Sequence, residues 1–366
     1  MAYNQWARKG KVGSMGIALG CLSILIHWYA PSSLIEELYS KGLFPLVRAV
    51  FDHTIALSPI PFFYLLVAGV IYLIYRGFFN LIRVWRDGWS HVFLFFVHIF
   101  NLLGWIIFAF YWLWGFNYDR IQLADRINWD SPSFSPEDFD NESSEVLQRL
   151  ESLRLTDSIL INDFLTNLNY DTIEWELRKE TSKVARALGY QGSDNLTCRQ
   201  LSPSGILLRF STAGFYNPFT GECNIDRGLH TLQKPFVMAH EFFHGLGVSG
   251  EGDCNFLAYI TCFQSANPVI RYSGELGYWR YLRGGYRRSN PALYRSKMEM
   301  LPSSVIMDLA EIDAAIRKYP DIAPRMRDAM YNAYLRSNKI EDGMANYHQI
   351  VTLVIEWRKN PSLIRD

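Results

Sequence analysis

Three long runs of apolar residues in the first third of the chain constrain its fold most strongly. They lie at about residues 12–30, 60–79 and 92–114. Each run approaches the length of about 20 residues that a helix needs to cross the hydrocarbon core of a bilayer. The third run ends in a cluster of tryptophan and tyrosine, which favour the membrane–water boundary. We therefore expect a membrane domain, residues 1–116, that contains three transmembrane helices.

Polar residues near these runs indicate orientation and packing. Basic residues precede the first run and also separate the second from the third, namely Arg8, Lys9, Lys11, Arg83 and Arg86. This bias favours a cytoplasmic N-terminus, and three crossings then place the rest of the chain outside the cytoplasm. We expect a multi-pass protein of the inner cell membrane. Inside the third run, His98 and Asn101 are expected to form interhelical hydrogen bonds.

The chain changes in character after the third run. Residues 117–142 are polar and rich in proline and acidic residues, which is typical of a juxtamembrane linker, and residues 143–366 form the second domain. Short strands are expected at residues 205–211 and 221–226. Helical patterns occupy much of the remainder, at about 136–168, 171–188, 303–319, 325–335 and 347–359. The expected fold is a mainly helical α+β domain with a small antiparallel sheet.

The composition limits the classes of partner and metal site that are expected. The chain has 36 basic and 36 acidic residues, so no net charge favours a nucleic-acid partner. It contains five cysteines without a CxxC pair, which argues against a zinc site built from cysteines. Four of them, Cys198, Cys223, Cys254 and Cys262, fall in the second domain. They either form disulfides in an oxidising space or remain free buried thiols, and the sequence leaves both possibilities open.

The motif His-Glu-Phe-Phe-His is the strongest functional feature. His240 and His244 are four residues apart, so on a helix both imidazoles project from one side and can bind one metal ion. Glu241 lies next to the first histidine and can reach a water at the metal. Pro235 suits the first turn of the helix, and the glycines that follow His244 are expected to end it.

A catalytic zinc site requires a third protein ligand. An acidic cluster returns within ten residues of His244. We expect Glu251 to be the ligand, with Asp253 as the alternative and His230 as a less favoured one. Asn255, four residues after Glu251, would hydrogen-bond a ligating histidine and fix its tautomer.

Zinc chemistry would follow from this arrangement. Glu241 would act as general base for water that attacks a scissile carbonyl. Another donor would stabilise the oxyanion, and Tyr259, Tyr272 and Tyr216 are candidates that the sequence does not separate. The strand expected at residues 205–211 could lie along the cleft and pair with an extended peptide.

Several longer motifs resemble a known family. They are "WGFNYDR", "GFYNPFTGECNID", "HEFFHGLGVSGEGDCNFLAY", "RYSGELGYWRYL" and "YLRSNKIEDGMANYHQIVTLVIEW". The chain resembles a bacterial membrane family, formerly a domain of unknown function with three N-terminal spans, that is regarded as zinc metallopeptidases. The resemblance implies a zincin-like domain outside the cytoplasm. Members usually carry glutamate and alanine where this chain has Asp253 and Cys254. The Glu-x-x-x-Asn spacing also resembles the Glu-x-x-x-Asp of gluzincins, which supports Glu251.

The sequence thus predicts a membrane-anchored zinc metallopeptidase, a hydrolase with Zn²⁺ as cofactor and a peptide or protein as substrate. Two alternatives stay open. One is a non-catalytic, membrane-anchored binding or scaffold protein, and the other is a zinc amidase that acts on cell-envelope substrates. Intramembrane proteolysis is disfavoured, because the apolar part of residues 234–263 is too short to cross a bilayer. Substrate, cleavage preference, activation and oligomeric state cannot be obtained from the sequence.

Overall fold

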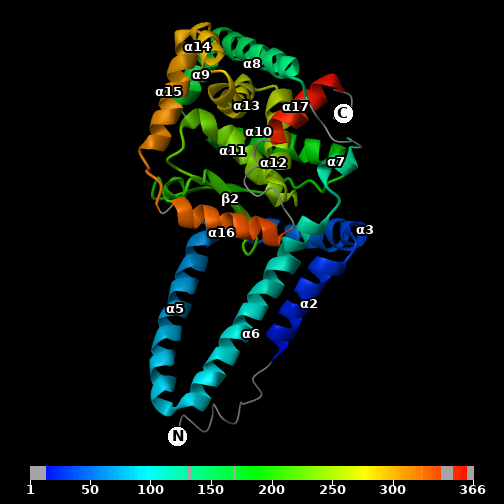
Figure 1. The fold of residues 1–366 in the computed structure, drawn as a ribbon, viewed down its shortest axis with the longest axis vertical. Helices are drawn as coiled ribbons and strands as arrows, with labels where there is room; N and C mark the ends of the chain where they lie inside the picture. Colours follow the sequence, from blue (N-terminus) through cyan, green and yellow to red (C-terminus); the bar gives the residue numbers. More distant parts are fainter. Residues whose placement is uncertain are drawn as a thin grey trace. The chain divides into compact units, whose positions relative to one another are not determined.

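The computed structural model describes residues 14–127, 129, 134–167, 170–322, 324–338 and 349–360. Within these residues the chain is mainly helical, with one small sheet (Figure 1). They divide into two compact units. The N-terminal unit takes the described residues up to 47, residues 58–120 and residues 218–220. The C-terminal unit takes residues 48–57, 121–217 and the described residues from 221 onward.

Apolar helices make up most of the N-terminal unit. Its elements are α2 (Met15–Tyr29), α3 (Ser32–Leu34), the π-helix η1 (Ile35–Leu43), α5 (Phe62–Asp87), α6 (Trp89–Leu113) and the 3₁₀-helix η3 (Gly115–Asp119). Both α5 and α6 are long and apolar enough to cross a membrane. Helix α2 has only 15 residues and reaches spanning length only when joined to the bent segment Ser32–Leu57. The structure thus contains two clear candidate spans, and the expected third stays a prediction.

The turn between α5 and α6 is shorter than the sequence suggests. Helix α5 continues to Asp87, beyond the expected end of the second run, and α6 begins at Trp89. Only Gly88 separates them, with a φ of 109° that favours glycine. The basic residues expected in a loop, Arg83 and Arg86, therefore lie on the last turns of α5.

Glycines allow α2 to pack closely on α6. A Cβ atom at Gly104 would lie 2.2 Å from the carbonyl oxygen of Gly16, and one at Gly20 would lie 2.8 Å from the Gly104 Cα. Such close approach of small residues is typical of helix pairs in membranes. Asn101 of α6 accepts a hydrogen bond from the Gly16 amide at 2.8 Å, which is the interhelical contact expected of it. His98 Nδ1 contacts the Leu94 carbonyl of its own helix at 2.7 Å.

The end of α6 leads into a buried polar turn, η3, rather than directly into a solvated linker. Asp119 contacts the buried His27 imidazole at 2.7 Å. Arg120 donates two hydrogen bonds to Glu36, at 3.0 and 3.2 Å, and Ser40 donates to Asn117. The motif "WGFNYDR" therefore binds η1 to the ends of α2 and α6 within the N-terminal unit.

The C-terminal unit contains most of the remaining elements. Its helices are α7 (Leu123–Arg126), α8 (Pro136–Thr156), α9 (Ser158–Thr166), α10 (Tyr170–Ala187), α11 (Lys234–Gly245), α12 (Glu251–Gln264), α13 (Pro268–Ser289), α14 (Pro291–Glu299), α15 (Ser303–Arg317), α16 (Pro324–Ser337) and α17 (Gln349–Lys359). Three 3₁₀-helices, η2 (Ile55–Leu57), η4 (Leu208–Phe210) and η5 (Thr231–Gln233), also belong to it. Helix α4 (Phe44–Asp52) is shared between the units. Residues 339–348, part of the last motif, lie outside the described residues.

The sheet is mixed, which corrects the expected antiparallel arrangement. Its strands are β1 (Cys198–Leu201), β2 (Gly214–Asn217) and β3 (Glu222–Asp226), in the order β1-β3-β2. Strands β2 and β3 form an antiparallel hairpin, but β1 pairs with β3 in parallel, Cys198 opposite Cys223. The parallel pair arises because a loop and a 3₁₀-helix return the chain between β1 and β2.

The prediction of a strand at residues 205–211 is wrong. This segment contains η4 instead, and the reason is the buried carboxylate of Asp226. It accepts hydrogen bonds from the backbone amides of Gly205 at 2.7 Å, Leu207 at 2.7 Å and Leu208 at 3.1 Å. Amides gathered on one carboxylate cannot form a strand ladder, so no peptide-pairing edge exists there.

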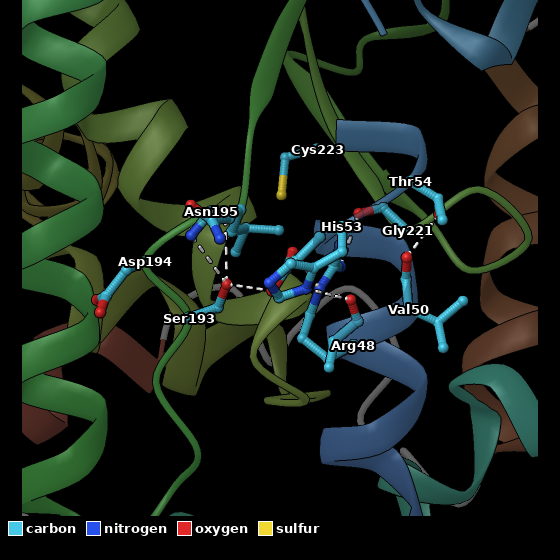
Figure 2. A network of polar contacts seen from close by, with 12 residues as sticks. Arg48, Val50, His53, Thr54, Ser193, Asp194, Asn195, Gly221 and Cys223 are labelled. Carbon is cyan, nitrogen blue, oxygen red and sulfur yellow. Dashed lines mark hydrogen bonds and ion pairs between the residues drawn. The ribbon is translucent and has the colours of Figure 1, made fainter. Parts of the chain in front are cut away.

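Residues 48–57 are joined to the sheet region by a buried polar network (Figure 2). Arg48 donates to the Gly221 carbonyl at 2.7 Å and to the Asp52 carboxylate at 2.9 Å. Ser193 donates to the same carboxylate at 2.5 Å. Since Gly221 lies in the β2–β3 turn, this network holds the turn of the hairpin in place.

Helix α11 is the centre of the C-terminal unit. It packs against β2 and β3 and against helices α10, α12 and α13. Its Phe242 and Phe243 side chains are almost fully buried, as is Trp279 of α13. Burying such aromatic side chains supplies much of the stabilisation of a core. The motif helix is therefore rigidly held on several sides.

Candidate metal centre

The ends of α11 are set by local sequence. Pro235 occupies the first turn, where its missing N–H costs no helical hydrogen bond. At the other end the Gly247 amide donates to the His244 carbonyl, and the Val248 amide donates to the Phe243 carbonyl at 2.9 Å. Gly247 has a φ of 85°. These bonds form a Schellman cap, which turns the chain back toward the histidines.

The turn brings three metal-binding groups together. The Nε2 atoms of His240 and His244 lie 3.1 Å apart. Oε2 of Glu251, in the first turn of α12, lies 3.2 Å from the first of these nitrogens and 3.6 Å from the second. Ligand atoms around a tetrahedral zinc ion, with bonds of about 2.0–2.1 Å, are about 3.3 Å apart. The three residues therefore have the spacing that a small divalent cation requires.

The helix cap orients the His244 imidazole. Its Nδ1 atom contacts the Val248 carbonyl at 2.9 Å, so this nitrogen carries a proton and Nε2 is the atom that faces His240 and Glu251. The Cys254 thiol lies 3.4 Å from the same Nδ1 atom. One Schellman turn thus both ends the helix and orients a candidate ligand.

Glu241 is buried beside the cluster without an obvious structural task. Its side chain is 3% exposed, and Oε2 has no hydrogen-bond partner among the described residues. Gly214 of β2 lies directly over it, since a Cβ atom there would come within 2.7 Å of Oε1. Burial, partly offset by His244, raises the pKa of Glu241 to about 8.

His240, His244 and Glu251 also shift one another's pKa values. Burial lowers the pKa of His240, against opposing contacts with Glu251 and Asn255. Burial opposes ionisation of Glu251, but the charge of His244 and hydrogen bonds from both histidines outweigh it and lower its pKa well below the usual value. The carboxylate is therefore ionised, as a metal ligand must be.

Asn255 lies where the sequence predicts a partner for a ligand. It lies beside His240 and partly opposes the lowering of the pKa of that imidazole, although His240 Nδ1 and Asn255 Nδ2 have no hydrogen-bond partner among the described residues. Its Oδ1 atom accepts a hydrogen bond at 3.0 Å from the hydroxyl of Tyr281, on α13. Tyr281 was not predicted, although it lies within the motif "RYSGELGYWRYL". Only the packing of α13 against α12 shows its position, so the motif was the one sequence signal available.

Asp253, the alternative ligand, is not part of the cluster. Its buried side chain hydrogen-bonds the backbone of Leu123. Burial raises the pKa of Asp253 to about 7. His230 also lies elsewhere, with its Nε2 3.4 Å from Glu311.

The three tyrosines proposed to contact a transition state are engaged with other groups. Each hydroxyl has a polar partner that is not a residue of the cluster. Tyr259 donates to Glu275 at 3.1 Å, Tyr272 donates to Asp308 at 2.6 Å, and Tyr216 accepts from Arg48 at 3.4 Å. Their roles in catalysis stay predictions that these contacts do not favour. All five cysteines are free thiols in the structure.

Comparison with known proteins places this chain in a family. A family profile described as "Protein of unknown function (DUF3810)" matches residues 39–355. The chain belongs to this family. The match covers α5, α6 and every residue of the candidate metal centre. No curated protein and no solved structure matches the chain.

Proposed function

We propose that this protein is a membrane-anchored zinc metallopeptidase in which His240, His244 and Glu251 hold the metal and Glu241 is the general base. The observation that carries the proposal is the convergence of the three ligand atoms, 3.1–3.6 Å apart, beside a buried carboxyl group with an unpartnered oxygen. Two imidazoles and one carboxylate are a donor set that catalytic zinc sites use.

The positions of these side chains suit metal binding better than they suit hydrogen bonding between the side chains themselves. Two imidazole nitrogens that face each other at 3.1 Å form at most one hydrogen bond, and Nδ1 of His244 already donates to the Val248 carbonyl of the Schellman turn. A zinc ion held there would lower the pKa of a water molecule and polarise the carbonyl group of a substrate.

Glu241 would carry the proton transfers. Its carboxylate accepts a proton from the attacking water and delivers it to the leaving nitrogen as the C–N bond breaks. Burial beneath Gly214 keeps this carboxyl group out of bulk water. Such burial brings its basicity closer to that needed near neutral pH. The β2 strand therefore has a part in the site through contact with Glu241.

The membrane topology is part of the proposal. With the N-terminus in the cytoplasm, three crossings place the C-terminal unit on the extracytoplasmic side of the inner membrane. Support comes from the apolar helices α5 and α6. A structural zinc site, as in a scaffold protein, normally has four protein ligands, whereas the cluster found among the described residues has three.

The test is Glu241→Gln in the full-length protein, purified in detergent and compared with the wild type. We expect metal analysis to show the same zinc content and hydrolysis of a quenched-fluorescent peptide library to fall about 10²–10⁴-fold. The exposed Glu299 on α14 supplies the control, Glu299→Gln, which should retain activity. Equal activity of Glu241→Gln and wild type would refute the proposal. Wild-type protein that holds zinc and cleaves only cell-envelope amides would identify the amidase instead.

A further inference from the structure

An exposed apolar stripe runs along the helical segment that follows α2. Leu34, Leu38, Leu46 and Val50 are 49, 67, 65 and 60% exposed. They are spaced in multiples of four residues, with Gly42 at the missing position. Large apolar side chains collected on one exposed face mark a surface that another apolar phase covers.

The π-helix η1 keeps this stripe straight. In an α-helix, residues four apart drift around the axis, because one turn has 3.6 residues. The wider turns of η1 compensate for that drift between Leu34 and Leu46. Residues Leu34, Leu38 and Leu46 therefore share one face across α3, η1 and α4.

The opposite face of the same segment is buried. Ile35, Tyr39 and Phe44 are at most 5% exposed, and Glu36 and Ser40 hold the polar contacts with η3. On α4, Arg48 points into its network while Val50 points away from it (Figure 2). The stripe is thus on the exposed side of a segment whose other face is buried, and the exposed ion pair of Lys41 and Glu37 lies beside it.

The chain on both sides of the segment is apolar and helical. Helix α2 ends two residues before α3 begins, and the candidate span α5 begins shortly after Leu57. The bend between α2 and Ser32–Leu57 is 117°. If α2 runs along the bilayer normal, the segment runs within about 27° of the bilayer plane, because 117° exceeds a right angle by that amount. Its exposed side chains then lie at the level of the lipid headgroups.

We propose that residues 32–47 form an interfacial helical segment whose Leu34, Leu38 and Leu46 side chains insert into the headgroup and upper acyl region of the bilayer. Such monotopic helices bury an apolar face just below the headgroups and keep the polar face out of the hydrocarbon. The partner is the lipid surface itself, and the inference does not depend on the metal centre or on its chemistry.

The experiment uses the full chain in nanodiscs of phosphatidylcholine and phosphatidylglycerol. Cys21 is the exposed cysteine, whereas the other four are buried, so Cys21→Ser gives a background for labelling. An environment-sensitive NBD group is attached at Leu38→Cys or, separately, at Leu46→Cys. Glu37→Cys is the matched control, since Glu37 is exposed, lies next to Leu38 in sequence and forms an ion pair with Lys41. Lipids with doxyl quenchers near the headgroup or near the chain ends report the depth of each label.

We expect labels at positions 38 and 46 to be quenched by the shallow doxyl lipid about twofold more than the label at 37, with blue-shifted emission. Stronger quenching by the deep doxyl lipid would overturn the proposal in favour of a membrane-crossing or re-entrant segment. No difference between positions 38 and 37 would overturn it in favour of water exposure or a protein partner. Agreement of the two labelled leucine positions, with unchanged circular dichroism, separates an interfacial helix from local unfolding.

Discussion

The C-terminal unit contains two buried polar clusters that share helix α12. The candidate metal centre includes Glu251 in the first turn of this helix, and the second cluster includes Tyr259 two turns later. Both clusters remove charged groups from water, which is costly unless each charge is paired. The two clusters differ in whether arginine side chains of the protein neutralise the buried carboxylates.

The second cluster is largely closed by its own charges, although Oε2 of Glu275 has no hydrogen-bond partner among the described residues. Arg149 donates to Glu275 at 2.9 Å and to Glu142 at 3.0 Å. Arg358 of α17 donates to the Tyr259 hydroxyl at 2.6 Å, and that hydroxyl donates to Glu275. Two guanidinium groups thus face two buried carboxylates. This network joins α8, α12, α13 and α17.

The metal centre is not closed in this way. Its two imidazoles face each other, and one oxygen of Glu241 has no partner among the described residues. Both clusters contain a carboxylate oxygen without a hydrogen-bond partner among the described residues, Oε2 of Glu241 in one and Oε2 of Glu275 in the other. They differ because two guanidinium groups face the carboxylates of the second cluster, whereas the first brings two imidazole nitrogens and a carboxylate to the spacing of metal ligands. The comparison thus contrasts an ion-pair network with a candidate metal site on one helix.

The largest effect is expected from Glu251→Ala. Removal of the carboxylate leaves two histidines as ligands. Loss of a residue that only hydrogen-bonds a ligand lowers metal affinity about 10–100-fold, so loss of a ligand itself should lower it further. Peptidase activity should fall with it, while the circular dichroism of the metal-free protein stays close to that of the wild type. Metal titration monitored by calorimetry measures the change. Stoichiometric zinc in this variant would mean that another residue, such as Asp253, completes the site.

Arg149→Met should affect stability instead of metal binding. The variant leaves Glu142 and Glu275 buried without this cation, which typically costs about 3–5 kcal/mol. Thermal unfolding should shift to lower temperature, and the folded fraction should still bind one metal ion. A variant with normal stability and lost metal would break the comparison, because the second cluster would then serve the site.

The same network predicts a pH effect. Burial raises the pKa of Glu275 above 4.5, and the charges of Arg149 and Arg358 only partly oppose the shift. A carboxyl group with a raised pKa in the folded state stabilises the fold below the unfolded pKa, and this contribution is lost as pH rises through the folded pKa. Each unit of difference is worth about 1.4 kcal/mol.

Glu275→Gln should remove that dependence. The amide imitates the protonated carboxyl group, so the wild type should lose stability relative to the variant as the pH rises above about 4.5. Thermal midpoints of both proteins across this range provide the measurement. Parallel curves would show that the folded state does not perturb Glu275.

The sequence predicted the part of the metal centre that depends on short-range geometry. His240 and His244 share a helix face because of their spacing, and Gly247 permits the turn that returns Glu251 to them. Each of these relations involves residues close in sequence. The helix start at Pro136 is similar, since Ser135 and Asp138 cap it reciprocally.

Relations across long sequence distances could not be predicted. Gly214 lies over Glu241, and Arg48 holds the β2–β3 turn, through packing between distant elements. Strand β1 pairs with β3 in parallel, and the Asp226 carboxylate binds backbone amides of residues 205–208 where a strand was expected. Apolar periodicity carries no information about such contacts, and a carboxylate that organises amides does not differ in sequence from a solvated one.

The smallest effect is expected from Tyr281→Phe, which tests whether a residue of α13 supports the candidate metal centre. Tyr281→Phe removes the hydroxyl that donates to Asn255, and Asn255, which lies beside His240, would then be held less firmly. We expect metal affinity about tenfold lower, with little change in stability, because loss of an outer partner disorients a ligand without removing it. The control is Tyr278→Phe on the same helix, where the buried hydroxyl has no hydrogen-bond partner among the described residues. Its removal leaves no group unsatisfied, so zinc affinity should not change. If both variants bind zinc equally well, Tyr281 belongs with the packing of α13, and the metal centre ends at Asn255.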